Sequence, residues 1–182
     1  METNTEVAIF GGGCFWCTEA VFQMLKGVTG VAPGYAGGQN PNPTYSEVCT
    51  GTTGHAEVIR VEYNPSLVSY RTLMTVFFGS HDATQLNRQG NDVGTQYRSS
   101  IFPTTPEQAK EARTFIKELQ DSSTEGDPIV TTVEENTMFY PAEASHQNYY
   151  NQNKNQGYCQ IIIAPKLAKV QKEFADLLQH PF

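Results

Sequence analysis

The sequence IFGGGCFWCTEAVF, residues 9–22, joins the end of an expected strand to the start of an expected helix through three glycines. Residues 5–10 read as a short strand. After the glycines, side chains recur at helical spacing at Phe15, Thr18, Phe22 and Leu25. Cys14 therefore falls in the first turn of a helix, where free backbone N–H groups and the helix dipole favour a thiolate. We expect a reactive cysteine here.

The second cysteine of this stretch, Cys17, lies about one helical turn beyond Cys14. The C-x-x-C spacing is found in thioredoxin-like redox pairs and in half of many zinc sites. Neither Cys49, Cys159 nor the four histidines supply a second ligand pair at suitable spacing, so we expect no metal. Cys17 either brings its sulfur close to Cys14 or packs beneath it, and packing is favoured.

The remaining pattern mixes strands and helices along 182 residues. Gly, Pro and Asn are frequent over 28–43, so we expect loops or short irregular strands at the surface, and a long loop at 79–96. We expect strands at 97–102 and 128–134, an extended segment at 156–163, and helices at 67–78, 106–120, 141–153 and 165–180. This order predicts a single α+β domain over 1–182, a layered α/β sandwich with a mixed central sheet flanked by helices.

Residues 54–64, GHAEVIRVEYN, alternate like a strand. The more apolar of its two faces carries His55, Glu57, Ile59, Val61 and Tyr63. Burial on this face would raise the pKa of the Glu57 carboxyl and keep it protonated near neutral pH, as a general acid requires. The alternative is a carboxylate at a strand end that faces water or pairs with Arg60 or Arg98.

The overall composition excludes several classes of protein. Twelve Lys and Arg against 19 Asp and Glu give a net charge of −7, so nucleic acid is not an expected partner. No stretch approaches the roughly 20 apolar residues of a membrane span, and no signal segment is evident, so we expect a cytoplasmic protein away from membranes. Four cysteines are too few for a disulfide scaffold.

Five motifs occur in order between residues 11 and 159: GGGCFWCTE, GYAGG, NPTYSEVCTGTTGHAE, QGNDVGTQYRS and NQGYCQ. Together they closely resemble the peptide-methionine (S)-S-oxide reductases, the A-type methionine sulfoxide reductase family. The resemblance implies a ferredoxin-like core with long catalytic loops. It also implies an oxidoreductase that repairs oxidised proteins by reducing the S epimer of methionine sulfoxide, free or in proteins. No cofactor is implied, because electrons arrive from thioredoxin or another dithiol, and we expect a monomer.

The resemblance further implies a reaction sequence. The Cys14 thiolate attacks the sulfoxide sulfur while Glu57 protonates the departing oxygen, and Cys14 becomes a sulfenic acid. Cys159 then resolves the sulfenic acid as an intramolecular disulfide, which a thioredoxin-type donor reduces. Many family members have glycine at the position of Cys17, so this thiol could compete with Cys159, act as a relay or be silent. Cys49 is expected to be a bystander.

Six further positions are implied to contact the substrate. Phe15 and Trp16 are implied to form the walls of a pocket for the S-methyl group. The hydroxyls of Tyr45 and Tyr97 are implied to hold the sulfoxide oxygen. Asp92 is implied to lie at the rim of the site, and His146 is a looser match to the family pattern.

Two other functions remain open at this point. A thioredoxin-like dithiol–disulfide exchanger would use Cys14 and Cys17 as its redox pair and would not need Glu57. A non-catalytic module would bind sulfoxide-containing or unoxidised protein segments and would show no activity with a dithiol donor.

Overall fold

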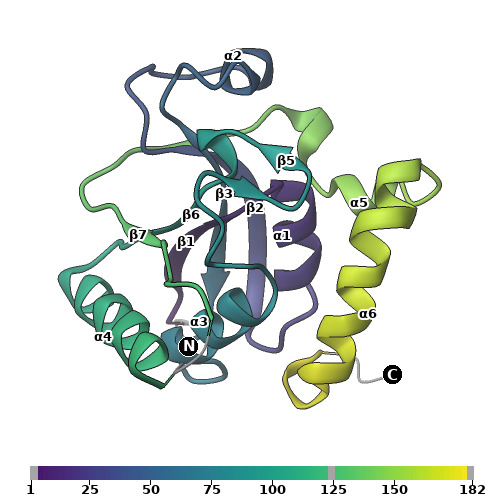
Figure 1. Ribbon diagram of the computed structural model, residues 1–182. Helices are drawn as coiled ribbons and strands as arrows, with labels where there is room; N and C mark the ends of the chain where they lie inside the picture. Colours follow the sequence, from purple (N-terminus) through teal and green to yellow (C-terminus); the bar gives the residue numbers. More distant parts are fainter. Residues whose placement is uncertain (1–3, 123–125, 180–182) are drawn as a thin grey trace.

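The computed structural model describes residues 4–122 and 126–179, which form a six-stranded mixed sheet with helices packed against it (Figure 1). The spatial order of the strands is β7-β6-β1-β3-β2-β8, and all neighbouring pairs are antiparallel except β6 and β7. The strands are β1 (Glu6–Gly12), β2 (Val28–Ala36), β3 (Ala56–Tyr63), β6 (Ser99–Phe102), β7 (Thr132–Val133) and β8 (Phe139–Pro141). The predicted layered α+β fold with a mixed sheet is confirmed.

Six α-helices are found in the described part of the chain: α1 (Phe15–Phe22), α2 (Tyr45–Cys49), α3 (Tyr70–Gly79), α4 (Pro106–Ser122), α5 (Tyr149–Gln152) and α6 (Ala164–Glu173). In Figure 1, α1 lies between the sheet and α6. None of the helices among the described residues is long and apolar enough to cross a membrane. Seven of the eight residues of α1 are buried, which makes it the central helix of the core.

The expected strand, glycine turn and helix at the start of the chain are confirmed. β1 ends at Gly12, and Gly13 adopts a φ of 99°, a left-handed value that glycine reaches without steric cost. Cys14 is the N-cap residue of α1. The long polar segment expected at 79–96 holds a two-stranded hairpin of β4 (Arg88–Gln89) and β5 (Asp92–Val93), followed by a 3₁₀ turn, η1 (Thr95–Tyr97).

Loops or short irregular strands were expected at the surface over 28–43, and the first half is instead one nine-residue strand, β2, paired on both sides between β3 and β8. Pro33 does not break the pairing: its nitrogen has no hydrogen to donate, and its carbonyl accepts from the Ala142 N–H at 2.9 Å. Gly34 is required by packing, since a Cβ there would clash with the Phe139 ring on β8. The glycines and proline mark close strand approach rather than a loop.

The C-terminal third also differs from the prediction. The expected extended segment 156–163 contains a π-helical turn, η3 (Cys159–Ile163), which runs into α6. Cys159 and Ile163 are buried while Ile161 is 72% exposed, a helical rather than an alternating pattern. The expected helix 141–153 is only a 3₁₀ turn, η2 (Ala144–His146), and the short α5.

Two further expected elements are shorter than predicted. The strand expected at 128–134 forms only β7. The final helix ends at Glu173 and is followed by a 3₁₀ turn, η4 (Ala175–Leu177); position 180, where the helix was expected to end, lies outside the described residues.

Candidate active site

The turn between β1 and α1 presents Cys14 at the start of a helix. The Cys14 carbonyl accepts from the N–H groups of Cys17 at 3.1 Å and Thr18 at 3.4 Å, and from the Thr18 hydroxyl at 3.1 Å. These hydrogen bonds hold the first turn of α1 in place and so fix the position of the Cys14 backbone, from which its side chain projects. Cys14 itself is 9% exposed. A ligand therefore reaches a thiol that is nearly, though not fully, enclosed.

Glu57 lies beneath this helix start, on the buried face of β3 as predicted. Its Oε1 accepts from the Phe15 backbone N–H at 3.1 Å, and its Oε2 has no hydrogen-bond partner among the described residues. The side chain is 1% exposed, and this burial raises the pKa of the carboxyl to about 8. Glu57 is therefore protonated at neutral pH and keeps one oxygen available to a substrate.

The two thiols of the C-x-x-C stretch influence each other's ionisation. Burial, followed by the neighbouring Cys17 thiol and the charge of Glu57, raises the pKa of Cys14 well above its usual value. The neighbouring Cys14 thiol is the main cause that lowers the pKa of Cys17 to about 7, and Lys166 contributes. Cys17 is thus the more acidic thiol of the pair, whereas the helix start alone had favoured Cys14. Desolvation outweighs the helix dipole because Cys14 is buried.

Cys17 also contacts a tyrosine that connects it to Asp92. The Cys17 Sγ lies 3.8 Å from the Tyr158 hydroxyl, which donates to the Asp92 Oδ2 at 2.9 Å. Cys159 follows Tyr158 directly and is buried, and all four cysteines are free thiols. Burial raises the pKa of the Cys159 thiol, and the nearby Cys17 adds to this effect. Cys17 is thus near enough to both Cys14 and Cys159 to affect their pKa values.

Aromatic rings form a wall beside the helix start. Trp16 stacks on Tyr149 with ring centroids 3.8 Å apart and donates from Nε1 to the His146 Nδ1 at 3.1 Å. Tyr45 packs on His146 with centroids 4.3 Å apart, and on Phe15 at 6.1 Å. Burial lowers the pKa of His146, which keeps the ring neutral as an acceptor. Four residues expected at the substrate pocket are therefore gathered in one cluster.

The remaining two expected residues lie at the same site. Burial raises the pKa of both Tyr45 and Tyr97, and for both the nearby Glu57 carboxyl raises it further. The charge of Asp92, on β5, raises the pKa values of both Tyr97 and Glu57. Two half-buried tyrosines and the buried Glu57 carboxyl therefore lie near enough to affect one another's pKa values.

Sequence reasoning missed several residues of the site. Tyr158 precedes Cys159 in the NQGYCQ motif, and Glu19 ends the GGGCFWCTE motif, so motif membership was the signal that could have found them. Tyr149 and Glu143 carried no such signal. Glu143 accepts from the Tyr35 hydroxyl at 2.9 Å and from the Tyr45 backbone N–H at 3.0 Å, and so holds the start of α2 in place.

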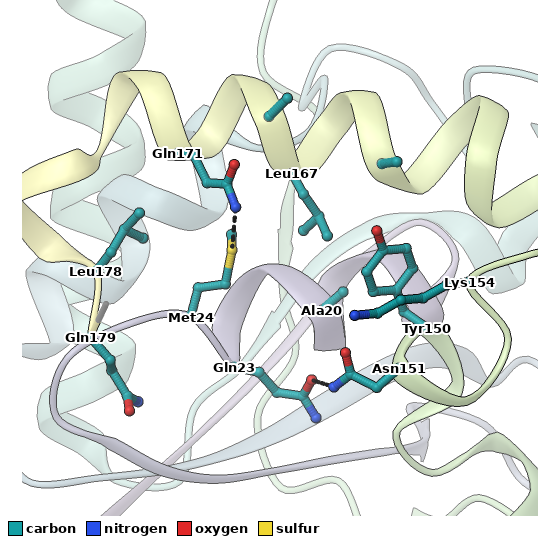
Figure 2. Close-up of a pocket in the computed structure, with 12 residues that line it drawn as sticks. Ala20, Gln23, Met24, Tyr150, Asn151, Lys154, Leu167, Gln171, Leu178 and Gln179 are labelled. Atoms are coloured by element: carbon teal, nitrogen blue, oxygen red, sulfur yellow. Dashed lines mark hydrogen bonds between the residues drawn. The ribbon is translucent and has the colours of Figure 1, made fainter. Parts of the chain in front are cut away.

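A cavity of about 460 Å³ lies between α1, α5 and α6, away from this cluster (Figure 2). Its walls include Met24 and Gln171, whose amide donates to the Met24 sulfur at 3.7 Å, and it contains none of the predicted site residues. No group of three or more metal-ligating side chains gathers within residues 4–122 and 126–179.

A cysteine at a helix start above a buried, protonated carboxyl is the arrangement expected of a thiol-dependent oxidoreductase. The family model for peptide methionine sulfoxide reductase matches residues 6–178. The chain belongs to this family, and it reduces methionine sulfoxide in a thiol-dependent reaction.

Its relatives agree along nearly the whole chain. The peptide methionine sulfoxide reductase MsrA of Deinococcus radiodurans is 55% identical over 174 residues, which cover 96% of this chain and 84% of the relative. The MsrA of Polynucleobacter asymbioticus is 53% identical over 173 residues, or 95% of this chain and 91% of the relative.

Solved structures show the same fold. Methionine sulfoxide reductase A of Corynebacterium diphtheriae superposes with a TM-score of 0.77 at 37% identity, covering 85% of this chain and 78% of the other. Reduced Mxr1 from Saccharomyces cerevisiae gives a TM-score of 0.79 at 36% identity, covering 87% and 91%.

Proposed function

We propose that Cys14 is the nucleophile and Glu57 the general acid of methionine sulfoxide reduction, and that the S epimer is the substrate. The Cys14 sulfur attacks the sulfoxide sulfur, the oxygen takes up the Glu57 proton, and methionine leaves as Cys14 becomes a sulfenic acid. The observation that carries this proposal is the protonated, buried Glu57 with an unpartnered oxygen directly beneath the Cys14 turn.

The thiol proton of Cys14 has a route to a neighbour. Because each of Cys14 and Cys17 shifts the pKa of the other, and in opposite directions, the pair holds one proton between its two thiols near neutral pH. Transfer of that proton to Cys17 leaves the nucleophile as a thiolate when the substrate is bound.

In the substrate complex, the S-methyl group lies against Phe15 and Trp16, and the hydroxyls of Tyr45 and Tyr97 donate to the sulfoxide oxygen. The clustering of these rings around the Cys14 turn supports this arrangement. Two residues complete the pocket: Asp92 at its rim and His146 behind the indole.

Resolution proceeds in two steps. Cys17 attacks the Cys14 sulfenic acid, which gives a Cys14–Cys17 disulfide and water. Cys159 then attacks the Cys17 sulfur, which frees Cys14 and gives a Cys17–Cys159 disulfide. The mutual effect of Cys14 and Cys17 on their pKa values, and the effect of Cys17 on that of Cys159, support this order over the direct attack of Cys159 on Cys14 that the family resemblance implied.

The donor that reduces this disulfide is a thioredoxin-type protein. Mxr1 from Saccharomyces cerevisiae has been solved in complex with Trx2, and that chain is 26% identical to this one with a TM-score of 0.57, covering 82% and 89% of the two chains. The enzyme acts as a single-domain cytoplasmic monomer without a bound cofactor. Four free thiols are consistent with a reducing compartment.

The experiment is a single turnover without reductant, followed by peptide mapping. Wild type should yield one methionine from the S epimer and a Cys17–Cys159 bridge, whereas Cys159→Ser should stop at Cys14–Cys17. Cys17→Ser should accumulate the Cys14 sulfenic acid, and Cys14→Ser should release no methionine. Consumption of only the R epimer, or a Cys14–Cys159 bridge formed at the wild-type rate in Cys17→Ser, contradicts the proposal.

A further inference from the structure

Glu19 is a buried carboxyl group that the reaction does not use. It lies on α1 and is 1% exposed. Its two oxygens accept from different backbone N–H groups: Oε2 from Asn148 at 2.9 Å and Oε1 from Tyr149 at 3.3 Å. Burial raises the pKa of this carboxyl, and the two backbone hydrogen bonds oppose that shift. Losing one of these bonds in a buried site leaves a donor unpaired.

The segment that Glu19 holds has little regular structure of its own. Asn148 has a φ of 54°, in the left-handed region that non-glycine residues rarely adopt, and α5 after it has only four residues. Such a short helix is not stable by itself, so contacts with the rest of the fold fix its position.

Gln23, one turn after Glu19 on α1, adds a second attachment to the same segment. Its Nε2 donates to the Asn148 Oδ1 at 3.3 Å, and its Oε1 accepts from the Asn151 amide at 3.4 Å. Figure 2 shows Gln23 on α1 facing Asn151 across the edge of the cavity. Two side chains at i and i+4 on α1 therefore bind residues 148–151.

The held segment carries two members of the aromatic wall. Tyr149, whose N–H binds Glu19, stacks on Trp16 with the rings 3.8 Å apart and 8° from parallel, and His146 accepts from the indole. Trp16 precedes Glu19 by three residues on α1. Trp16 and Glu19, on neighbouring turns of α1, thus both bind the segment 146–149.

We propose that Glu19 is a positioning residue: by fixing residues 146–149 against α1, it holds Tyr149 and His146 on Trp16 and so shapes the pocket that binds the methionine sulfoxide side chain. This inference rests on the proposed role of Trp16 in the substrate pocket. Glu19 acts on substrate binding rather than on the chemistry at Cys14, because its side-chain hydrogen bonds go to the backbone of Asn148 and Tyr149.

The test is Glu19→Gln, since glutamine keeps the size of the side chain but replaces one accepting oxygen with an amide that cannot accept. We expect KM for methionine sulfoxide to rise about tenfold, with kcat changed less than about twofold. Trp16 is the only tryptophan of the chain, so its fluorescence reports the wall directly. Acrylamide quenching of that fluorescence should increase in the variant.

Two variants extend the test. Tyr149→Leu removes the stack while Glu19 stays intact, and it should raise KM similarly; the double variant should do little more than either single change. Should Glu19→Gln not fold, Gln23→Leu loosens the same segment and should raise KM about two- to threefold, with a smaller rise in quenching.

Glu118→Gln is the matched control, because Glu118 is exposed on α4 and forms an ion pair with Arg71 away from the aromatic wall. It should leave KM and quenching unchanged. Unchanged KM and quenching in both Glu19→Gln and Gln23→Leu would overturn the inference. The quenching measurement needs no turnover, so failure of this inference is distinguishable from failure of the proposed reaction.

Discussion

At the residue scale, Glu57 lies in a position that costs stability. One oxygen of its carboxyl accepts from the Phe15 N–H, and the second has no partner among the described residues. A buried polar atom without a partner destabilises a fold, and natural structures tolerate it mainly at functional sites. This cost supports the proposed role of Glu57 as a general acid, because its carboxyl keeps near pH 7 a proton that an exposed glutamate would already have lost.

Glu57→Gln tests this role in the first turnover. The variant still accepts from the Phe15 N–H but has no acidic proton, so the rate of methionine release should fall by about 10²- to 10³-fold. The wild-type rate should decline above about pH 8 as the carboxyl ionises, and the variant should lack this decline. Rapid-quench measurement of methionine between pH 6 and 9 checks both, and an equal rate in the two proteins would contradict the acid role.

The same substitution should stabilise the protein in a pH-dependent way. A carboxyl whose pKa rises on folding stabilises the native state below its unfolded pKa, and this contribution is lost as the pH rises toward 8. At pH 7 the free energy of unfolding is therefore about 3 kcal/mol lower than it is below pH 4, where the carboxyl is protonated in both the folded and the unfolded state. Urea unfolding should show Glu57→Gln more stable than wild type at pH 8 and nearly equal at pH 4.5. If the free energies of unfolding of Glu57→Gln and wild type differ by the same amount at both pH values, ionisation of Glu57 is not the cause of the difference.

The sequence could predict the place of these groups and the protonation of Glu57, but not which of the two thiols is the more acidic. Strand alternation placed Glu57 on the buried face, and the glycine turn placed Cys14 at a helix start, because both depend on local periodicity. The greater acidity of Cys17 depends on desolvation of Cys14 and on the effects of Tyr158 and Lys166, more than 140 residues away. Such contacts exist only in the folded chain.

At the element scale, the predictions succeeded where one periodicity dominates. The helix expected at 106–120 is α4, and the strand expected at 54–64 is β3, because each has a clear apolar face. β2 was missed because its glycines and proline reflect contacts with β8, which pairs from more than 100 residues away. The turn at Cys159 was missed because three consecutive isoleucines favour a strand, while tertiary packing selects a helix.

Gly34→Ala tests the explanation for β2. An added Cβ would clash with the Phe139 ring and the Tyr140 carbonyl, so the free energy of unfolding should fall by about 1–3 kcal/mol. Gly30→Ala is the control in the same strand, because its nearest neighbour is a Glu62 oxygen at 3.4 Å, and it should change stability by less than about 0.5 kcal/mol. Urea midpoints at constant m-value give both numbers. Equal midpoints for the two variants would refute the close-approach argument.

At the scale of the whole molecule, the active site draws on both halves of the chain. Cys14, Trp16 and Glu19 lie near the start, and the segments that carry His146, Tyr149 and Tyr158 lie near the end. The last described residues return to the end of α1: the Lys26 N–H donates to the Leu177 carbonyl, and the Gln179 N–H to the Met24 carbonyl, both at 2.8 Å. This pairing closes the C-terminal segment onto the helix that carries the thiols.

Leu178 lies at this closure, and its replacement should weaken the entire domain. It is 1% exposed and forms a bridge with Leu25, so Leu178→Ala should lower the free energy of unfolding by about 2–4 kcal/mol. Because the sheet, α1 and α6 share one core, unfolding should remain a single transition in both Trp16 fluorescence and far-UV circular dichroism. Leu67→Ala, at a position 69% exposed, should change stability by less than about 0.5 kcal/mol. Separate transitions in the two signals for wild type would contradict the single-domain prediction, and a Leu178→Ala midpoint equal to that of Leu67→Ala would show that the closure does not stabilise the core.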